Sequence, residues 1–424
     1  MISNKLIAID FGSTHIAAMA AEVQENGAVK IFSEESKVSD DVKWGIVEKP
    51  SGASFKVSEL LKLLKNSAKV TDISHVSVPV GAKSMKQVSA SVSRFVGKPN
   101  VVTENLLSEM LEECEKKSEQ SDTTVFDVIP ASYLLDGKRM DDPVGQTAVQ
   151  ITANYHVIIG NSIIKSELER CFDRTGFMLE YCPLAAEAIS TVVLEEQERE
   201  VGSALINFGA TTTTLAVYHD GILQNLLVVP LGANNITKDI QELGINEANS
   251  ERLKYLKGSA LESMVDEPVY VQIASEDEKN PPVKISTKFL ATIIEARLEE
   301  MMQPIFDTID RLPFSLESGI VITGGGSKLN NIIEFIEEKI GICPRFGNHS
   351  EWLSEDTNEK FHNPKYAQLV GTILLTHDFR KTHPIEEDLI VNPKKKPKLP
   401  KVNTMDKLAG LFTNFFGEEN ENKF

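Results

Sequence analysis

The stretch Leu6–Ala20 reads LIAIDFGSTHIAAMA, and Leu205–Tyr218, which reads LINFGATTTTLAVY, repeats its design. In both, an apolar run leads into an acidic or amide residue, a Gly and small hydroxyl residues, and a second apolar run follows. We expect each stretch to form a β-hairpin whose turn offers backbone N–H groups and hydroxyls to a phosphate chain. One such turn is weak support, because most glycine turns only connect two strands. Two of them, one in each half of the chain, predict an internal duplication that holds one ligand between two lobes.

A third segment, Gly319–Leu329, reads GIVITGGGSKL. We expect a buried strand, a turn of three glycines, and a helix that starts at Ser327 with Lys328 beside it. A strand that runs through glycines into a helix N-terminus suits a flat base and an α-phosphate that lie against bare backbone. For this segment alone, the alternative is a flexible loop between a strand and a helix.

The order of hairpin, hairpin and triple glycine resembles the actin-like ATPase superfamily, which includes actin, heat-shock chaperone ATPases, sugar kinases and bacterial filament proteins. The resemblance implies an α/β chain with a duplicated actin-like (ribonuclease-H-like) two-lobed ATPase fold that binds ATP and Mg²⁺. It also implies that Asp10 orients the hydrated Mg²⁺. The implied ATP contacts are Gly12, Ser13 and Thr14 in the first turn, Gly209, Ala210, Thr211 and Thr212 in the second, and Gly324, Gly325, Gly326, Ser327 and Lys328 in the adenosine motif.

The chain departs from that superfamily pattern at four positions, one of which is Cys182, before Pro183, where the wider superfamily often has an acidic residue. The second phosphate loop usually begins with Asp, and here the residue is Asn207; Ala210 replaces the usual second Gly, and His15 stands where several relatives have Lys or another polar residue. Asn207 is the candidate catalytic position, and an amide holds a hard cation less well than a carboxylate. The pattern therefore supports ATP binding and predicts at most weak ATPase activity.

The segment Ser250–Gly258 reads SERLKYLKG and resembles a ribose-contacting helix of actin-like proteins. Glu251 and Lys254 lie at positions i and i+3 of one helix face, so both side chains could reach a sugar. Without the resemblance, this spacing is typical of an ordinary surface ion pair.

Composition limits the class of protein further. The chain has 424 residues, which is too many for one core, and its formal net charge of −18 argues against nucleic acid as a partner. The four cysteines show no CxxC spacing, which indicates a reducing compartment and no zinc site. The N-terminus lacks the pattern of a signal peptide, and no run approaches the ~20 apolar residues of a spanning helix.

The C-terminal region changes character after about residue 385. Pro393–Lys401 reads PKKKPKLPK, which predicts an extended, solvated linker. Val402–Gly417 regains a helical period, and its large apolar residues fall on one side of the helix. This arc predicts contact with an anionic membrane surface, although a helix that docks on the protein's own body or on a partner remains the alternative. The residues of the arc are Met405, Leu408, Leu411, Phe412, Phe415 and Phe416.

The region between the two hairpins is similar to one particular family. Phe126–Gly145, FDVIPASYLLDGKRMDDPVG, together with the following QITANYHVIIG, closely resembles the inserted subdomain of the bacterial division family FtsA. Members of that family also end in a variable linker and an amphipathic helix. For the insert alone, the alternative is a decorative α/β insertion.

The FtsA resemblance implies a peripheral protein of the cytoplasmic face of the inner membrane, which polymerises with itself, anchors the tubulin-like FtsZ and meets other divisome proteins. Two rivals share the fold: a pilus-assembly scaffold, against which the tail helix counts, and a sugar or acid kinase, for which no substrate-side base stands out. We expect lobe 1 in residues 1–83, 161–197 and 346–385; the insert in 84–160; the core of lobe 2 in 198–232 and 301–345; its small subdomain in 233–300; the linker in 386–401; and the tail helix in 402–417.

Helical spacing and turn residues also locate individual elements. The predicted helices are Val57–Asn66, Val101–Lys117, Ser162–Thr175, Asn246–Gly258, Lys288–Asp310 and Ile332–Ile340, and Asp136–Gly137 is a predicted hairpin turn.

Overall fold

The computed structural model describes residues 5–68, 74–274 and 281–384. The described residues divide into two compact units: those up to Met85 with those of Ile163–Thr376, and Lys86–Ser162 with the described residues that follow Thr376. The expected linker and tail helix, 386–401 and 402–417, lie outside the described residues.

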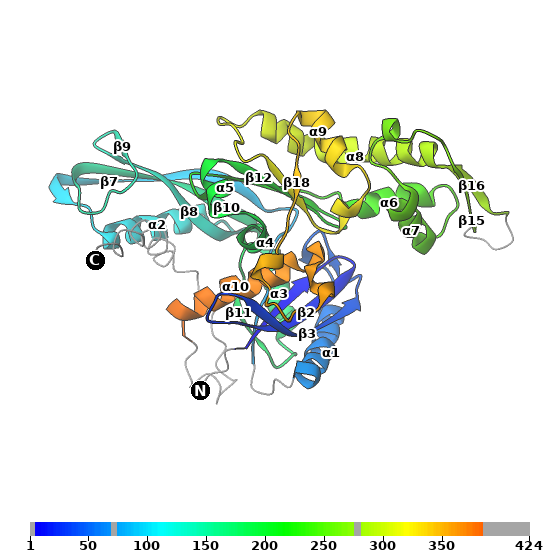
Figure 1. Ribbon diagram of the computed structural model, residues 1–424. Coiled ribbons are helices and arrows are strands. Elements are labelled where there is room, and N and C mark those ends of the chain that lie inside the picture. Colours follow the sequence, from blue (N-terminus) through cyan, green and yellow to red (C-terminus); the bar gives the residue numbers. More distant parts are fainter. Residues whose placement is uncertain (1–4, 69–73, 275–280, 385–424) are drawn as a thin grey trace, which may run out of the picture. The chain divides into compact units, whose positions relative to one another are not determined.

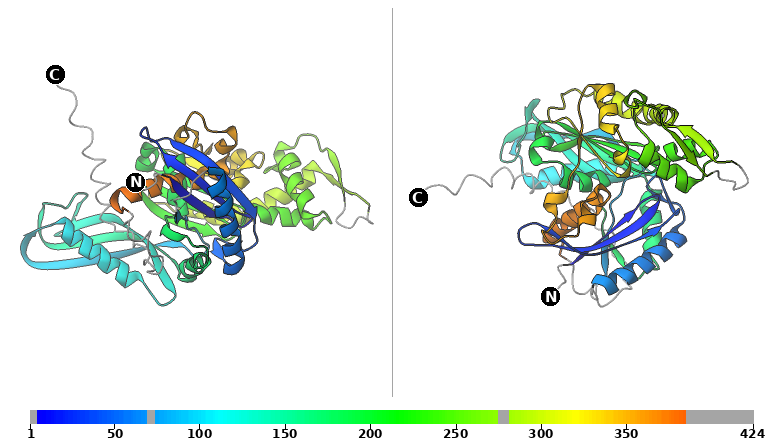
Figure 2. Two further views of the ribbon diagram at one scale, coloured as in Figure 1. Left: turned by 90° about the horizontal axis from the view of Figure 1, so that it is seen from below. Right: turned by 45° about the vertical axis from the view of Figure 1, so that its right-hand side comes forward.

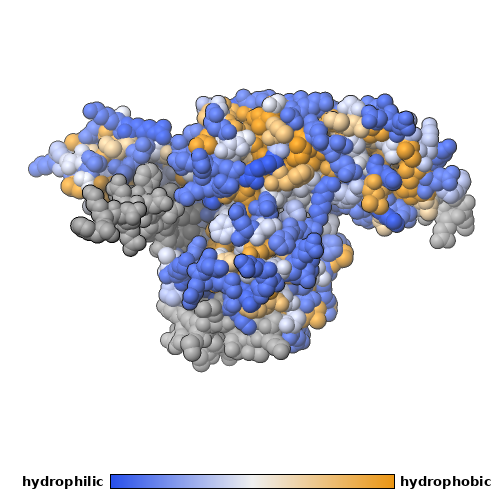
Figure 3. Space-filling view, viewed as in Figure 1, coloured by the Kyte–Doolittle hydropathy of each residue, from blue (hydrophilic) through white to orange (hydrophobic). Residues whose placement is uncertain are grey.

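The first lobe of the first unit is a five-stranded sheet in the order β11-β6-β1-β2-β3. Figure 1 labels β11, β2 and β3 of this sheet. Its first three strands form an antiparallel meander, whereas β6 and β11 run parallel to β1 and join the other edge. Helix α1 runs along β2 and β3 (Figure 2), and the visible face of this lobe is mostly hydrophilic (Figure 3). The elements are β1 (Leu6–Phe11), β2 (His15–Val23), β3 (Val29–Val38), β4 (Val42–Lys43), β5 (Ile46–Val47), α1 (Pro50–Ala68), β6 (His75–Ser77), α3 (Ile163–Phe172), β11 (Met178–Tyr181), α4 (Ala185–Val193) and α10 (Ala367–Thr382).

The second lobe repeats this arrangement. Strands β12, β13 and β14 form an antiparallel meander, and β17 and β18 extend the sheet on the other side in parallel with β12. Because both lobes combine a three-stranded meander with two parallel strands, the predicted duplication and fold class are confirmed. The elements are α5 (Glu196–Val201), β12 (Ser203–Phe208), β13 (Thr213–His219), β14 (Ile222–Val229), α8 (Thr287–Asp310), β17 (Ile320–Thr323), α9 (Ile332–Ile340) and β18 (Arg345–Phe346).

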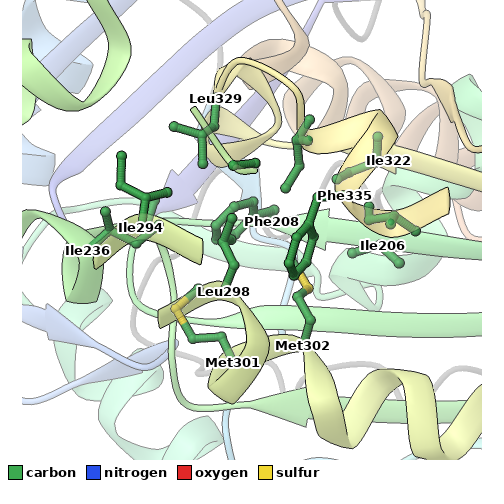
Figure 4. Close-up of a cluster of buried hydrophobic side chains, with 14 of the residues drawn as sticks. Ile206, Phe208, Ile236, Ile294, Leu298, Met301, Met302, Ile322, Leu329 and Phe335 are labelled. Carbon is green, nitrogen blue, oxygen red and sulfur yellow. The ribbon is translucent and has the colours of Figure 1, made fainter. Parts of the chain in front are cut away.

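The core of the second lobe lies between its sheet and α8. Phe208 from β12, Met302 from α8 and Phe335 from α9 are buried in one cluster of apolar side chains (Figure 4). Burial of such side chains supplies the main favourable free energy of folding, at about 1.5–3 kcal/mol for each large residue. The cluster therefore fixes the end of β12, which carries the second phosphate turn.

A small subdomain extends the second lobe. It contains α6 (Ala233–Gln241), α7 (Glu247–Lys257), the hairpin strands β15 (Tyr270–Ile273) and β16 (Val283–Ser286), and the first part of α8. The predicted helix around α7 is confirmed with its capping residue, because the Asn246 side chain accepts a hydrogen bond from the Asn249 N–H.

The part of the second unit between Lys86 and Ser162 consists of four strands and one helix. Strand β10 (Thr147–Asn161) pairs antiparallel with β7 (Lys86–Val101) and β8 (Thr123–Leu135), and β9 (Lys138–Met140) returns along β8. Helix α2 (Glu104–Ser118) packs on one face, where its residues share a core with Tyr133 and Tyr155. The turn predicted at Asp136–Gly137 is confirmed, since both residues have positive φ angles of 49° and 82°.

Several predicted boundaries are wrong for identifiable reasons. The helix expected from Val57 begins at Pro50, and the helix expected from Val101 begins at Glu104, because Val101 still belongs to β7 and Thr103 caps the helix. No α-helix starts at Ser327: a 3₁₀ turn occupies Gly325–Lys328, and α9 begins at Ile332. Asn331, the residue directly before α9, has a left-handed conformation with a φ of 61°. The chain therefore turns once more between the glycines and the helix.

Candidate functional site

A cavity of about 620 Å³ lies between the two lobes of the first unit, and the ends of β1, β12 and β17 open into it. Both predicted phosphate turns and part of the triple-glycine segment line this cavity. The three segments that sequence analysis selected from distant parts of the chain are therefore brought to one place.

The first turn places a carboxylate and two hydroxyls in the cavity. Asp10, at the end of β1, lines it together with Gly12, Ser13 and Thr14. A Cβ atom on Gly12 would lie 2.7 Å from the His15 carbonyl oxygen, so only glycine fits this tight turn. Burial raises the pKa of Asp10 to about 6. A nearby cation would stabilise the charged form of this carboxylate.

The second turn has the same backbone design with a neutral first residue. Asn207 lies at the end of β12, and Gly209, Ala210, Thr211 and Thr212 follow it along the cavity wall. The Gly209 N–H donates to the Thr212 carbonyl oxygen at 2.9 Å and closes the turn. The two turns meet, because the hydroxyls of Ser13 and Thr211 are hydrogen-bonded at 2.6 Å. Two polar groups, one from each lobe, thus converge on one point.

The triple glycine is pressed against the second turn. Gly324 has a φ of +89°, and a Cβ atom on it would lie 2.5 Å from the Asn207 Oδ1 atom. A Cβ on Gly326 would lie 2.5 Å from the ring of Phe208. Gly324, Gly325 and Lys328 line the cavity, whereas Gly326 and Ser327 are buried behind it. Packing against the second turn therefore requires Gly324 and Gly326 to be glycine.

Glu251 and Lys254 have different environments, although we expected both to reach a sugar. Glu251 lines the cavity, but Lys254 does not and is only 1% exposed. The Lys254 ammonium donates to the Thr237 hydroxyl at 2.8 Å, to the Glu251 carboxylate at 2.7 Å and to a backbone carbonyl. Burial lowers the pKa of Lys254, and the hydrogen bond to Glu251 opposes this shift. Lys254 holds Glu251 in place instead of facing the cavity itself.

Sequence analysis missed several polar residues of the cavity wall, among them Tyr255, Lys365 and Gln368. Tyr255 donates its hydroxyl to the Gly325 carbonyl oxygen at 3.2 Å, and it follows directly on Lys254 in the segment that was considered. Lys365 lies just before α10 and Gln368 is the second residue of that helix, in a segment without a recognisable motif. Burial and the positive charge of Lys365 lower the pKa of Lys328, so both cations face the same space.

The cavity suits a cation whose ligands are mainly water and phosphate oxygens, with few protein carboxylates. In the described part of the chain, no three His, Cys, Asp or Glu side chains are arranged to hold a metal ion. Asp10 supplies one partly buried carboxylate, and Mg²⁺ in phosphate sites usually keeps several waters and binds few protein carboxylates. The residues therefore fit a hydrated Mg²⁺ that is held through water by Asp10 and by the phosphates of a ligand.

Solved structures with a similar arrangement define the class of the protein. The PilM–PilN type IV pilus biogenesis complex matches with a TM-score of 0.64 and 15% identity, covering 89% of this chain and 99% of that chain. MreB5 of Spiroplasma citri bound to ADP matches with a TM-score of 0.57 and 12% identity, covering 91% and 100%. Together with the duplicated lobes, these likenesses show that the protein has the actin-like ATPase fold.

Sequence comparison identifies the family within that class. A family model described as "Cell division protein FtsA" matches residues 204–371, and one described as "SHS2 domain inserted in FTSA" matches 82–159. The FtsA protein of Borreliella burgdorferi is 27% identical over 392 residues, which are 91% of this chain and 94% of that protein. The two family models and this relative together support the chain's membership of the FtsA family of cell division proteins. None of the chain's described helices has the length and apolarity that crossing a membrane would need.

Proposed function

We propose that the protein is an ATP-binding actin homologue that polymerises on the cytoplasmic face of the inner membrane and anchors FtsZ filaments during division. The observation that carries this proposal is the pair of phosphate turns, one from each lobe, whose hydroxyls Ser13 and Thr211 meet at 2.6 Å beside the 620 Å³ cavity. A ligand with a chain of phosphates would bind both lobes at once and fix their relative position.

In this proposal, different groups of the chain bind different parts of the nucleotide. Backbone N–H groups and hydroxyls of the two turns bind the phosphates, and Asp10 orients the waters of Mg²⁺. Gly324, Gly325 and Tyr255 form the adenosine wall, while Glu251, held by Lys254, binds the ribose. ATP with Mg²⁺ supplies a transferable phosphoryl group, and the protein's role is mainly to hold it.

The cavity gives little support to a sugar or acid kinase. Among the described residues, the carboxylates that line it are Asp10 and Glu251. Asp10 accepts a hydrogen bond from Gln368 and faces the phosphate turn, and Glu251 is bound to Lys254 on the opposite wall. A kinase needs a base within reach of its acceptor hydroxyl, and neither residue is placed for that role.

The surface of the small subdomain supports a role in assembly. Several large apolar side chains of residues 233–300 are at least half exposed, and the part of Figure 3 that corresponds to this subdomain shows apolar residues at the surface. Exposed apolar groups of this kind are typical of protein contacts. These residues are Leu256 (60%), Met264 (50%), Val269 (58%), Tyr270 (62%) and Phe289 (53%). We assign protein partners to this surface.

The insert is proposed to mediate assembly and to make no contact with nucleotide. Residues 84–160 contain none of the Gly-rich phosphate turns, and the family model for the inserted domain matches 82–159. Deletion of the insert should leave ATP affinity unchanged and abolish filaments or partner recruitment. Loss of ATP affinity in a deletion variant whose other domains remain folded would contradict this assignment.

Membrane attachment is proposed for the last ~25 residues, because a Lys-rich linker precedes an apolar arc there. Phe412→Glu and Phe415→Glu each place a charge in this arc. Each variant should therefore lose its binding to anionic vesicles and keep its ATP binding. Salt should weaken vesicle binding only in part, because it screens the Lys contribution and leaves the apolar one. Full vesicle binding by the double variant would contradict the proposal.

The function as a whole is tested by co-pelleting with FtsZ on anionic vesicles in the presence of Mg²⁺ and ATP. We expect FtsZ to pellet with vesicles only when this protein is present, and to stay in solution with the Phe412→Glu/Phe415→Glu variant. Vesicle binding without FtsZ recruitment would overturn the division assignment. Absence of vesicle binding would instead favour the pilus-type scaffold.

A further inference from the structure

Gln368 connects the start of α10 to the first phosphate turn. Its side-chain Nε2 atom donates a hydrogen bond to the Asp10 Oδ1 atom at 2.8 Å, and both residues line the cavity. The other carboxylate oxygen of Asp10, Oδ2, lies 3.8 Å from the point where a Cβ on Gly12 would be. One oxygen of Asp10 is thus occupied by Gln368, and the other faces the phosphate turn.

The position of Gln368 is fixed by tight packing of α10. Three residues along the helix, Gly371 lies so close to α4 that a Cβ on it would be 1.7 Å from the Ala188 carbonyl oxygen. The neighbours Leu369 and Val370 are fully buried, and the Thr372 hydroxyl bonds back to the Gln368 carbonyl oxygen at 2.7 Å. The helix cannot shift or rotate without breaking these contacts, so the amide of Gln368 is presented to Asp10 in one orientation.

We propose that Gln368 is a positioning residue of the nucleotide site: it holds Asp10 through Oδ1 so that Oδ2 is directed at the water shell of a phosphate-bound divalent cation. This inference rests on the proposed binding of ATP. A free carboxylate rotates about χ2 and spreads its charge over several directions. A donor on one oxygen removes that freedom and favours the charged form, which is the form that attracts the cation.

The proposal is tested with Gln368→Leu, which keeps a similar volume and removes the donor. ATP affinity is measured by calorimetry with Mg²⁺ and again in EDTA. The Kd in EDTA divided by the Kd with Mg²⁺ reports how much the cation strengthens ATP binding. We expect this ratio to fall about tenfold, the effect of one hydrogen bond to a charged group. The Kd in EDTA and the thermal midpoint of the apo protein should stay within about twofold and a few degrees of the wild type. A merely structural role of Gln368 would change the EDTA affinity and the midpoint as well.

Gln303→Leu is the matched control, because Gln303 on α8 also donates to a carboxylate, Asp307, at 2.7 Å but is exposed and outside the cavity. This variant should leave the Mg²⁺ benefit unchanged.

A double-mutant cycle with Asp10→Ala decides whether Gln368 acts through Asp10. If it does, Gln368→Leu has no further effect on the Mg²⁺ benefit once Asp10 is removed. Equal losses in the two backgrounds, or a loss of affinity in EDTA as large as that in Mg²⁺, would show that Gln368 contacts the nucleotide or only packs, and would overturn the inference. Failure of the wild type to bind ATP under either condition would instead overturn the proposed function, and the inference with it.

Discussion

The two phosphate turns have the same strand pairing but different charge. In the first, Asp10 lies opposite Ala17 across the β1–β2 pair; in the second, Asn207 lies opposite Thr214 across β12–β13. The first carries a partly buried carboxylate that accepts a hydrogen bond from Gln368, and the second carries a neutral amide next to Gly324. Both lobes thus share the turn geometry proposed to bind phosphates, but only the first turn carries a charge that a cation or an attacking water would use.

In the proposed function, this difference would let one site hold a nucleotide well and turn it over slowly. Binding would draw on backbone groups of both turns and on the proposed adenosine wall, which an Asn in place of Asp leaves intact. Hydrolysis needs charge at the reacting end of the phosphate chain, and lobe 2 offers none from Asn207. The turns should therefore respond differently to substitution.

The largest effect is expected for Asp10→Ala. Removal of the one carboxylate beside the phosphate turns should weaken ATP binding in Mg²⁺ by about 100-fold, while binding in EDTA changes little. Titration calorimetry under the two conditions measures both values. Asp310→Ala, at the exposed end of α8, is the control. Equal affinity of Asp10→Ala and wild type in Mg²⁺ would show that the two turns do not differ as described.

A smaller effect is expected on the stability of the apo protein. Burial raises the pKa of Asp10 from 3.8 to about 6, so the native state holds more protons than the unfolded state between these pH values. Stability therefore falls as the pH rises through this window, and the cost is fully present above pH 6. Asp10→Asn should stabilise the apo protein by about 1–3 kcal/mol at pH 7.5 and hardly at all near pH 4.

Thermal or chemical unfolding at the two pH values measures this difference. Asn207→Ala is the comparison from the second turn and should show no such pH dependence, because it removes no titratable group. A stabilisation by Asp10→Asn that is the same at both pH values would contradict the explanation by buried charge.

The change Asn207→Asp tests whether the neutral residue of the second turn limits ATP turnover. It restores a charge in the second turn, and we expect ATP turnover to rise about tenfold with little change in ATP affinity. Phosphate release under saturating Mg²⁺ and ATP is the measurement, and Asn225→Asp on β14 of the same lobe is the control. Turnover that stays at the wild-type value would show that the missing carboxylate does not limit hydrolysis.

The smallest effect is expected for Thr211→Val, which removes one hydroxyl of the pair that joins the turns. Backbone groups supply most of the phosphate contacts, so ATP affinity should fall only about threefold to fivefold, as for one neutral hydrogen bond. Thr292→Val, at an exposed site on α8, should have no effect. A loss of 100-fold or more would mean that the hydroxyls, and not the backbone, bind the phosphates.

The parts of the structure that sequence could predict are those whose cause is local. Both hairpins and the triple glycine carry their own turn residues within about fifteen positions, and the duplication follows from their similarity. The sequence did not predict the start of α1, because Gly52 is a poor helix former. Glycine is needed at this position for a tertiary contact, since a Cβ on Gly52 would clash with the Asp41 carboxylate.

The parts of the site that sequence could not predict come from distant packing. Gln368 is 358 residues from Asp10, and nothing near it in the chain marks it as part of a site. The separation of roles between Glu251 and Lys254 was also hidden, because the i, i+3 spacing shows that two side chains share a helix face but not which one is buried. Only the packing of α7 against Thr237 of α6 decides this.

The central claim, that the site holds ATP without rapid turnover, is tested most directly by measuring ATP affinity and steady-state turnover on one preparation of the full chain with Mg²⁺. The account predicts binding in the micromolar range or tighter and turnover well below ~1 per second. Turnover in the ordinary enzyme range of ~1–10³ per second would contradict it and restore the kinase or motor alternative.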